Sequence, residues 1–235
     1  MSTQFVTLHN RALLKVSGPD AASFLQGLIT NDIHKLDNQE PMIYACMLTP
    51  QGKFLFDFFI LKMGDAYMMD IEGGARAQDL LKRLETYKLR ADVTLELADQ
   101  IPVYAILGGL DPAGIPDPRH KDIGNRSFER PDDDFDDIHE ADFDMWDYQR
   151  ITLGIPDGSR DLIPEKSTMD EARMDTLNAI DYDKGCYVGQ ELTARMHYRG
   201  LGKKHLEVVD IHTLPEKSDL RSTCGDIGLA LVRAT

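Results

Sequence analysis

Hydrophobic and polar positions alternate in short runs over the first hundred residues, and two helical patterns interrupt them. The runs FVTLH and RALLKVSG predict two strands on either side of His9 and Asn10. Residues 18–32 place apolar side chains on one helical face, at Phe24, Leu25, Leu28 and Ile29. Residues 42–63 read as a hairpin around a Pro-Gln-Gly turn, and residues 74–89 as a second amphipathic helix between further strands. Hairpins mixed with single helices predict an α+β fold with antiparallel sheet.

The pattern changes in the second half of the chain. Residues 108–130 are rich in Gly, Pro, Asp and Arg and show no period, and residues 131–147 are strongly acidic, which favours a solvated loop or linker. Residues 142–156 look helical up to Gly154, and residues 169–180 are expected to form a short helix or turn. Two strands are predicted near the end, HLEVVDI and DIGLALVRA.

Composition and charge limit the classes of protein. The chain has 235 residues, of which 42% are hydrophobic and 28% charged, and a formal net charge of −14. A surface this acidic repels bare nucleic acid, so we expect no direct nucleic-acid partner. No apolar run approaches eighteen residues, and the first residues lack the pattern of a signal peptide, so we expect no membrane association. Three cysteines without close spacing indicate free thiols, no metal site and a cytoplasmic location.

One stretch concentrates reactive groups, KGCYVGQELTARMHYRG at residues 184–200. Cys186 follows Lys184 and Gly185, and a nearby cation favours the reactive thiolate. Lys184 and Cys186 are therefore candidate catalytic residues. The alternative is that Cys186 is a small buried apolar residue, which is the usual fate of cysteine. His197 lies nearby in sequence and could serve as a base, although sequence does not place it beside the sulfur.

The rest of this stretch offers polar and cationic side chains. Gln190 and Glu191 supply an amide and a carboxylate, but Glu191 and Arg195 are also spaced as an ordinary pair on a helix surface. The densest cationic segment of the chain follows, with Arg195, His197, Arg199, Lys203, Lys204 and His205. It can hold a phosphate or a polyanionic tail, or it can be a solvated strand face.

Two isolated carboxylates complete the candidates. Asp57 interrupts the apolar run FLFDFFIL, and a lone carboxylate there is costly unless it is paired or hydrogen-bonded. Its partner is either a structural donor or a bound ligand. Glu171, in DEARMD, is unremarkable by itself. By spacing alone, the sequence predicts a small-molecule-binding α+β protein with one candidate functional cysteine, Cys186.

The stretch at residues 184–200 resembles the hallmark of the YgfZ family, the folate-binding, T-protein-like proteins of iron–sulfur metabolism. The family pattern K-G-C-[YF]-x-G-Q-E-x-x-A-R is matched from Lys184 to Arg195, and a basic, glycine-ended tail follows at Arg199 and Gly200. The resemblance extends to VSGPDAASFLQGLITNDI, LTPQGKFLFDF, YKLRADV and LGIPDG, and so covers nearly the whole chain.

The resemblance implies three domains in a ring around a folate-sized cavity. These would be a discontinuous folate-binding domain of residues 1–40 and 98–196, an inserted α+β domain of residues 41–97, and a short C-terminal β-barrel segment of residues 197–235. It also implies a tetrahydrofolate-type cofactor. The family's cysteine falls on Cys186. The cofactor-binding residues would be Asp57, Glu171, Gln190, Glu191, Arg195 and Arg199, with Glu171 in the place of the pterin-contacting glutamate of T-proteins.

Three functions fit the resemblance. The favoured one is a tetrahydrofolate-binding accessory protein in iron–sulfur cluster assembly or repair, which would serve iron–sulfur enzymes, tRNA-modifying ones among them, or assembly proteins. The second is a tetrahydrofolate-dependent aminomethyltransferase. T-proteins carry an Asp-Asp pair where this chain has Phe56-Asp57, so one carboxylate is lost, and whether the chain is an enzyme stays open. The third is a non-catalytic cluster carrier, although Cys186 has no close companion.

Overall fold

A five-stranded sheet lies in the middle of the molecule, which we describe from a computed structural model. The structure describes residues 3–38, 40–98, 100–108, 114–131, 138–200 and 202–233. The sheet has the order β3-β4-β5-β2-β6, and its neighbouring strands are antiparallel. Its strands are β2 (Arg11–Ser17), β3 (Ile43–Leu48), β4 (Phe54–Met63), β5 (Ala66–Glu72) and β6 (Thr94–Ala98). The predicted hairpin is β3–β4, and Gly52 in its turn has the positive φ of 75° that favours glycine.

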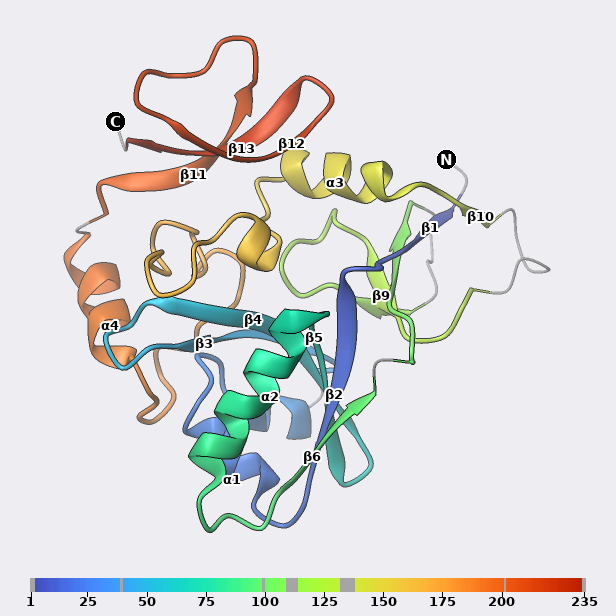
Figure 1. The fold of residues 1–235 in the computed structure, drawn as a ribbon, viewed down its shortest axis with the longest axis vertical. Coiled ribbons are helices and arrows are strands. Elements are labelled where there is room, and N and C mark those ends of the chain that lie inside the picture. Colours follow the sequence, from blue (N-terminus) through green and yellow to red (C-terminus); the bar gives the residue numbers. More distant parts are fainter. Residues whose placement is uncertain are drawn as a thin grey trace.

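Two helices cover one face of this sheet. They are α1 (Ala21–Gln26) and α2 (Ala75–Lys88), and their apolar side chains Leu25, Leu80 and Leu84 pack against the sheet. The first helix is shorter than predicted, and the 3₁₀ helix η1 (Ile33–Asp37) follows it. The backbone between them pairs with β3 instead, since Thr30 N donates to Cys46 O at 2.9 Å. Figure 1 shows α1 and α2 in the lower half of the view, to the left of β2.

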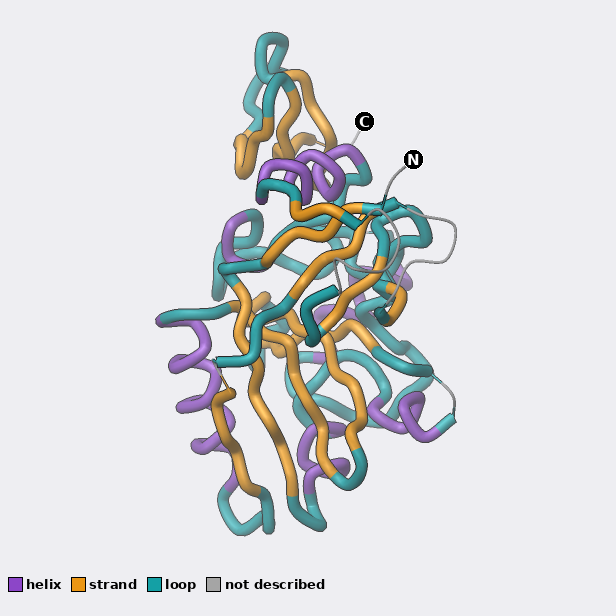
Figure 2. Tube along the Cα trace, turned by 90° about the vertical axis from the view of Figure 1, so that its right-hand side faces the viewer, coloured by secondary structure: helices purple, strands orange, loops and turns teal. Residues whose placement is uncertain are grey.

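A second sheet packs against the opposite face. Its order is β10-β1-β7-β9-β8, formed by β1 (Gln4–Thr7), β7 (Tyr104–Leu107), β8 (Ile115–Pro116), β9 (Asn125–Ser127) and β10 (His139–Glu140). Val6 and Ala105 of this sheet share a core with Tyr44, Phe59 and Leu61 of the first sheet. In Figure 2 no helix lies in front of the lower strands, which belong to the first sheet. These elements confirm the α+β class.

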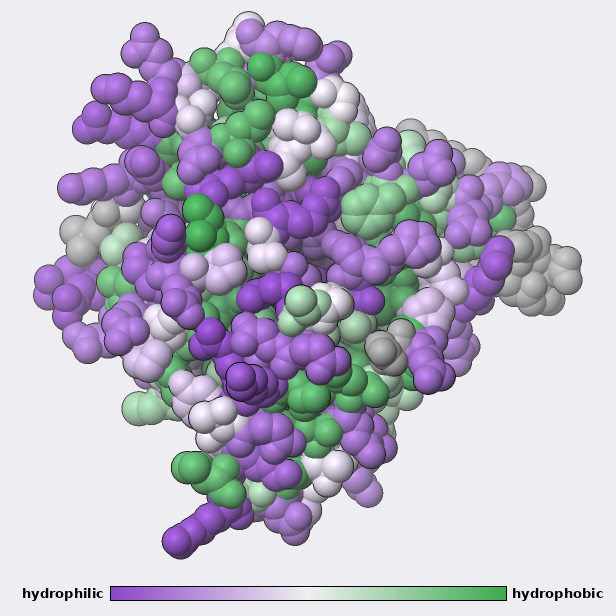
Figure 3. Space-filling view, in the orientation of Figure 1, coloured by the Kyte–Doolittle hydropathy of each residue, from purple (hydrophilic) through white to green (hydrophobic). Residues whose placement is uncertain are grey.

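The C-terminal strands form a third, open sheet rather than the short barrel that the resemblance implied. Its order in the described residues is β11-β13-β12, with β11 (Lys204–Asp210), β12 (Asp219–Cys224) and β13 (Ile227–Arg233). It packs on α3 (Phe143–Thr152), where a closed barrel would need further strands. Figure 3 shows an apolar patch over this sheet on a mostly hydrophilic face. Val208, Leu214 and Leu220 are among its exposed apolar residues.

The remaining elements are η2 (Gly158–Arg160) and α4 (Gln190–Arg199), and residues 169–180 form turns. The acidic segment at residues 131–147 lies partly outside the described residues. The domain boundaries predicted at residues 40/41 and 97/98 stay a prediction. In the described residues, the strands of the first sheet all lie between residues 11 and 98, because β2 pairs with β5 and β6. The strands of the second sheet lie before residue 11 and after residue 98.

Candidate functional site

The face of the first sheet that meets the second sheet carries charged residues at one end. Residues directly opposite in neighbouring antiparallel strands share a face. The register pairs Arg11 of β2 with Glu72 of β5, and Leu13 with Asp70, so Arg11, Asp70 and Glu72 project to one side. Asp57 of β4 lies opposite Cys46 on the same face. The sequence therefore gathers several charged groups on an otherwise apolar surface inside the protein.

Buried ion pairs connect the two sheets at the charged end of this sheet face. Arg11 Nε lies 2.7 Å from Asp70 Oδ1, and Arg126 of β9 forms a second ion pair with Asp70. Arg126 Nε also lies 3.1 Å from Asp117 Oδ2, and Arg119 Nη2 lies 2.8 Å from the same oxygen. The guanidinium of Arg126 is 3.7 Å from the centroid of a nearby phenylalanine ring. Each charge has a partner, which is the condition for keeping it away from water.

Asp57 is the member of this cluster with an unused oxygen. The Tyr44 hydroxyl donates to Asp57 Oδ2 at 2.8 Å, whereas Asp57 Oδ1 has no hydrogen-bond partner within the described part of the chain. Burial raises the pKa of Asp57, against the opposing charge of Arg11 and the hydrogen bond from Tyr44. A carboxyl group with a raised pKa can stay protonated and donate, which suits it to a polar ligand atom or to acid catalysis. Its 2% exposure means that a ligand reaches it only if neighbouring groups move.

A second set of carboxylates lies beside Asp57. Asp157 accepts from Asn10 Nδ2 at 2.8 Å and from Arg160 Nη1 at 2.9 Å. Burial would raise the pKa of Asp157, but the positive charges around it prevail and hold that pKa at about 2. Glu72 accepts from Ser159 N at 3.2 Å. Asp57 and Asp157, close in space, thus have pKa values pushed in opposite directions.

The predicted reactive cysteine lies on a separate feature, which we call the cysteine loop, residues 181–189. Cys186 is exposed, Cys46 is buried and Cys224 is intermediate. The alternative that Cys186 is a small buried apolar residue is therefore wrong. Its exposed sulfur is available to a partner or a small molecule.

Lys184 anchors the cysteine loop rather than standing free beside the thiol. Its side chain is buried, and Nζ donates to three backbone oxygens, those of Gln26 at 2.8 Å, Ile29 at 2.7 Å and Asn31 at 2.8 Å. Burial lowers the pKa of Lys184 to about 8. The ammonium thus uses all three of its protons to hold the loop on the last residue of α1 and on the segment that follows it. A direct role for Lys184 in activating Cys186 stays a prediction.

Glycines in the cysteine loop permit a close approach to the β3–β4 turn. Gly189 has a φ of 86°, and a Cβ on it would lie 2.5 Å from Thr49 O. Gly185 differs, because nothing lies within 4 Å of its hypothetical Cβ. Glycine is therefore required at position 189, because two backbone segments pack closely there. Gly185 has open space around it, so the backbone next to Cys186 is uncrowded.

Helix α4 begins directly after the cysteine loop and carries four of the predicted cofactor-binding residues. Gln190 is partly exposed, and Glu191, Arg195 and Arg199 are exposed. Arg195 Nη2 lies 2.6 Å from Glu191 Oε1, so the ordinary i,i+4 surface pair is present. The ring of His197 stacks on Tyr182 at 3.8 Å between centroids. We observe no contact between His197 and Cys186 in the described residues.

Glu171 is used locally. Its Oε2 accepts from Thr168 N at 2.9 Å, and its own N donates to Thr168 Oγ1 at 3.2 Å. This reciprocal pattern is that of a capping box. The remaining carboxylate oxygen, Oε1, is the atom of Glu171 left for a ligand.

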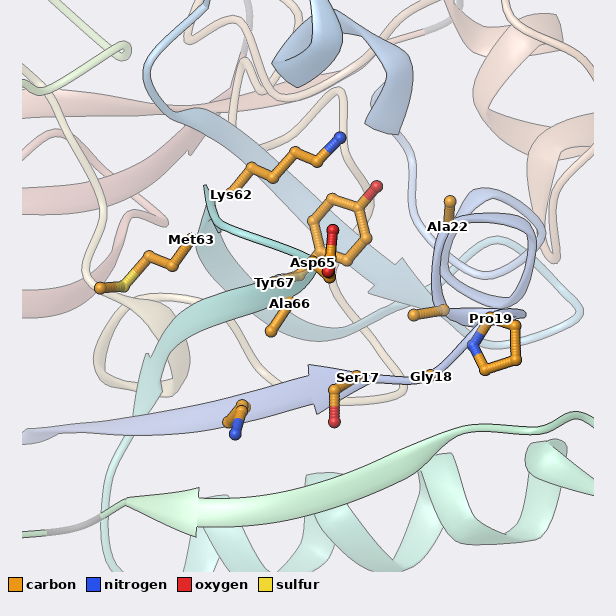
Figure 4. A pocket seen from close by; sticks show the side chains of 11 residues that line it. Ser17, Gly18, Pro19, Ala22, Lys62, Met63, Asp65, Ala66 and Tyr67 are labelled. Atoms are coloured by element: carbon orange, nitrogen blue, oxygen red, sulfur yellow. The ribbon is translucent and has the colours of Figure 1, made fainter.

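The predicted site residues thus lie in three places, one of them the local pair of Glu171 with Thr168. Lys184, Cys186 and the α4 residues lie on and beside the cysteine loop, and Asp57 belongs to the buried charged cluster. A groove of about 760 Å³ lies elsewhere, between Lys62, Asp65 and Tyr67 on one side and Ser17, Pro19 and Ala22 on the other (Figure 4), and none of the predicted site residues lines it. Within the described residues there is no cluster of three or more His, Cys, Asp or Glu side chains arranged to hold a metal ion, and no helix long and apolar enough to cross a membrane.

Sequence reasoning missed most of the buried charges. The buried charges of the cluster around Asp57 and Asp70 that it did not name are Arg11, Asp70, Asp117, Arg119, Arg126 and Asp157. Asp70 carries the signal that pointed to Asp57, namely a charge between apolar residues of a strand, whereas Arg11 is the first residue of β2. The other four lie in loops or very short strands, where charged residues are common and give no signal.

The fold and its relatives define the class of the protein. It superimposes on the crystal structure of the glycine cleavage system aminomethyltransferase T from Bartonella henselae with a TM-score of 0.73, at 14% identity, over 99% of this chain and 78% of that one. Residues 6–110 match the GCVT N-terminal domain. The protein is therefore an α+β protein with the T-protein fold.

The curated relatives of the chain are iron–sulfur cluster assembly factors. The chain is 34% identical over 231 residues to the mitochondrial iron–sulfur cluster assembly factor IBA57 homolog of Neurospora crassa, covering 85% of this chain and 52% of that protein. It is 31% identical over 228 residues to human mitochondrial IBA57, covering 85% and 64%. It thus spans about half to two thirds of the length of these relatives. The chain is thus similar to iron–sulfur cluster assembly factors over most of its length, which confirms the resemblance that the motif at residues 184–200 indicated.

Proposed function

We propose that the chain is a reduced-folate-binding accessory protein in iron–sulfur cluster assembly or repair, with Cys186 as its functional thiol. The observation that carries the proposal is an exposed cysteine on a loop that the hydrogen bonds of Lys184 hold in place. The chain is also related to iron–sulfur cluster assembly factors. A thiolate is the protein ligand that iron–sulfur clusters prefer. A fixed, uncrowded thiol can therefore accept or hand over a cluster, or hold one jointly with a partner.

The charged cluster supports the folate part of the proposal. A pterin ring presents N–H groups along its edge, and Asp57 Oδ1 is an unused acceptor. Glu171 and Gln190 are the next polar candidates, and Arg195 and Arg199 would meet the glutamyl tail. The ring of three domains around a folate-sized cavity stays part of this proposal.

A true aminomethyltransferase is the second candidate. Asp57 favours it, because a buried carboxyl with a raised pKa is suited to acid catalysis. Phe56 opposes it, because its side chain stands where T-proteins carry a second acid. A cluster carrier is the third candidate. It needs cluster ligands besides Cys186, and a partner or a small thiol would supply them, since Cys46 is buried in β3.

The partners and the location follow the same proposal. The clients would be iron–sulfur enzymes or assembly proteins, with tRNA-modifying enzymes among them, and the protein would act in the cytoplasm without binding nucleic acid or membrane. The formal charge of −14 supports the exclusion of bare nucleic acid.

Calorimetric titration with tetrahydrofolate tests the folate part. We expect saturable binding that Asp57→Ala and Glu171→Ala each weaken by about 1–3 kcal/mol, because each change leaves a ligand donor unpaired. Glu216→Gln, an exposed acid on the loop between β11 and β12, is the control and should bind as wild type. Absence of saturable binding at high micromolar folate would reject this part.

The glutamyl tail has its own comparison. Neutral residues in place of Arg195, Arg199 and Lys203 should weaken binding of polyglutamylated folate more than of the monoglutamate. The difference should shrink in high salt, because exposed charges are screened over about 8–10 Å. Equal losses for the two ligands would remove the tail from the proposal.

Complementation tests the iron–sulfur part separately. In cells that lack the native protein, wild type should restore iron–sulfur enzyme activity and Cys186→Ser should not. Restoration by Cys186→Ser would reject the thiol function, whatever the folate titration shows.

A further inference from the structure

The face of the first sheet that carries the charged cluster becomes apolar toward its other end. The register aligns Leu61, Met68 and Lys15 across β4, β5 and β2, and then Lys15 with Glu96 of β6. The neighbouring row ends in Leu13 opposite Ala98. Since side chains opposite each other share a face, Leu61, Met68, Leu13 and Ala98 form an apolar surface between the ion pair of Lys15 and Glu96 and the buried carboxylate of Asp70.

This surface forms the floor of a groove of about 640 Å³. The opposite wall comes from Phe128 and Glu129, which follow β9 of the second sheet, and Ile101 closes one side. Ile101 and Met63 are 39% and 59% exposed, so apolar side chains reach the mouth. A mostly apolar concavity of 300–1,000 Å³ with a few polar groups is the usual form of a small-molecule site.

The charges at the groove select one kind of ligand. Lys15 is already paired, with Nζ 3.6 Å from Glu96 Oε2. The carboxylate of Glu129 makes no ion pair or side-chain hydrogen bond with any part of the chain that the structure describes, and it is exposed at the rim. The groove therefore has an excess negative charge above an apolar floor.

We propose that this groove binds a small molecule with an apolar, ring-sized body and a positively charged group, the body lying on Leu13, Leu61 and Met68 and the cation facing Glu129. The site is distinct from the proposed folate site, because it lies at the opposite end of the sheet face from Asp57. The ligand gains by removing apolar surface from water, and the unpaired carboxylate orients it.

Two fluorescent probes of similar size and opposite charge test the proposal on the whole chain. Dansylcadaverine carries an ammonium group, and anilinonaphthalene sulfonate carries a sulfonate. We expect one saturable site for the cationic probe, with at least tenfold tighter binding than the anionic probe. Equal binding of the two probes, or no saturable binding of the cationic one, would overturn the proposal.

Variants locate the site. Glu129→Gln should reduce the preference for the cationic probe to less than threefold. Glu216→Gln removes the same charge from the loop between β11 and β12, and it should leave the preference unchanged. Equal effects of the two variants would show that overall charge and not the groove attracts the probe. Ala98→Leu fills the floor and should weaken both probes at least fivefold.

If Ala98→Leu fails to fold, Met63→Ser at the exposed mouth replaces it, with an expected loss of about threefold. An unchanged affinity in the folded variant would overturn the proposal. Addition of saturating tetrahydrofolate separates the two sites. The probe should stay bound, and its competitive displacement would show that the groove is part of the folate site.

Discussion

The carbonyl oxygen of Gly189 lies 2.8 Å from the position that a Cβ atom on Gly52 would occupy. Gly52 turns the β3–β4 hairpin and Gly189 ends the cysteine loop, so two segments far apart in sequence meet backbone to backbone. Both glycines have a positive φ, 75° and 86°. This contact fixes the cysteine loop on the C-terminal side of Cys186. The hydrogen bonds of the Lys184 ammonium fix the loop on the N-terminal side of Cys186.

Replacement of Gly189 by alanine tests the contact. We expect Gly189→Ala to lower the free energy of unfolding by about 2–4 kcal/mol, because the new Cβ would overlap Thr49 O in a backbone conformation that alanine disfavours. Gly185→Ala is the matched control from the same motif. Its Cβ meets nothing within 4 Å, so its cost should stay below about 0.5 kcal/mol. Equal losses in urea unfolding would show that close approach does not distinguish the two glycines.

Lys184 should matter for stability as well as for the loop. Lys184→Met keeps the length of the side chain but leaves the oxygens of Gln26, Ile29 and Asn31 without their donor. We expect a loss of about 1–3 kcal/mol in thermal unfolding and faster amide exchange in the cysteine loop. Lys203→Met, at an exposed lysine, is the control and should melt as wild type. A Lys184→Met protein with wild-type stability and exchange would show that the three hydrogen bonds do not hold the loop.

The strands and the turn glycine could be predicted from the sequence because they depend on local patterns. The alternation in RALLKVS and the Pro-Gln-Gly turn each lie within a few residues, and β2 and the β3–β4 hairpin formed as expected. The extent of α1 could not be predicted, because its end depends on pairing of Thr30 with Cys46 of β3. That competition is a tertiary effect that no helical period records.

The candidate site was predictable only in part, for the same reason. The exposed Cys186 lies where its motif indicated, but the partner of the Lys184 ammonium proved to be a loop more than 150 residues earlier. The partners of Asp70 are likewise distant, with Arg126 coming from the other sheet. Ion pairs between residues distant in sequence depend on how the sheets stack, and a single sequence does not specify that.

Acid should destabilise the protein through Asp117 and Asp157. Burial alone would raise the pKa values of both carboxyls, but the neighbouring arginines lower them to about 2. A carboxyl whose pKa is lower in the folded state stabilises the fold above its unfolded pKa of about 4, and that stability is lost as the pH falls toward 2. Each group accounts for at most about 2 kcal/mol. Urea unfolding should show a steep loss between about pH 4 and pH 2, and a flat profile there would contradict the buried ion pairs.

The last prediction concerns the order in which the three thiols react. Cys186 is exposed and Cys224 is intermediate, whereas Cys46 is buried in β3, where burial raises the pKa of its thiol well above the ordinary value. A limiting amount of an alkylating reagent should therefore label Cys186 first and Cys46 last, because only an accessible thiolate reacts. Mass spectrometry of the digested protein measures that order.

Replacement of this cysteine separates function from packing. Cys186→Ser should change the free energy of unfolding by less than about 0.5 kcal/mol, since the side chain is exposed and nothing packs on it that serine cannot replace. The matched Cys46→Ser should destabilise the fold by about 1–3 kcal/mol, because it places a hydroxyl in an apolar core. If Cys186 proves the slowest thiol to react and Cys186→Ser melts several degrees lower, the cysteine loop is a packing element and the proposed role of its thiol is wrong.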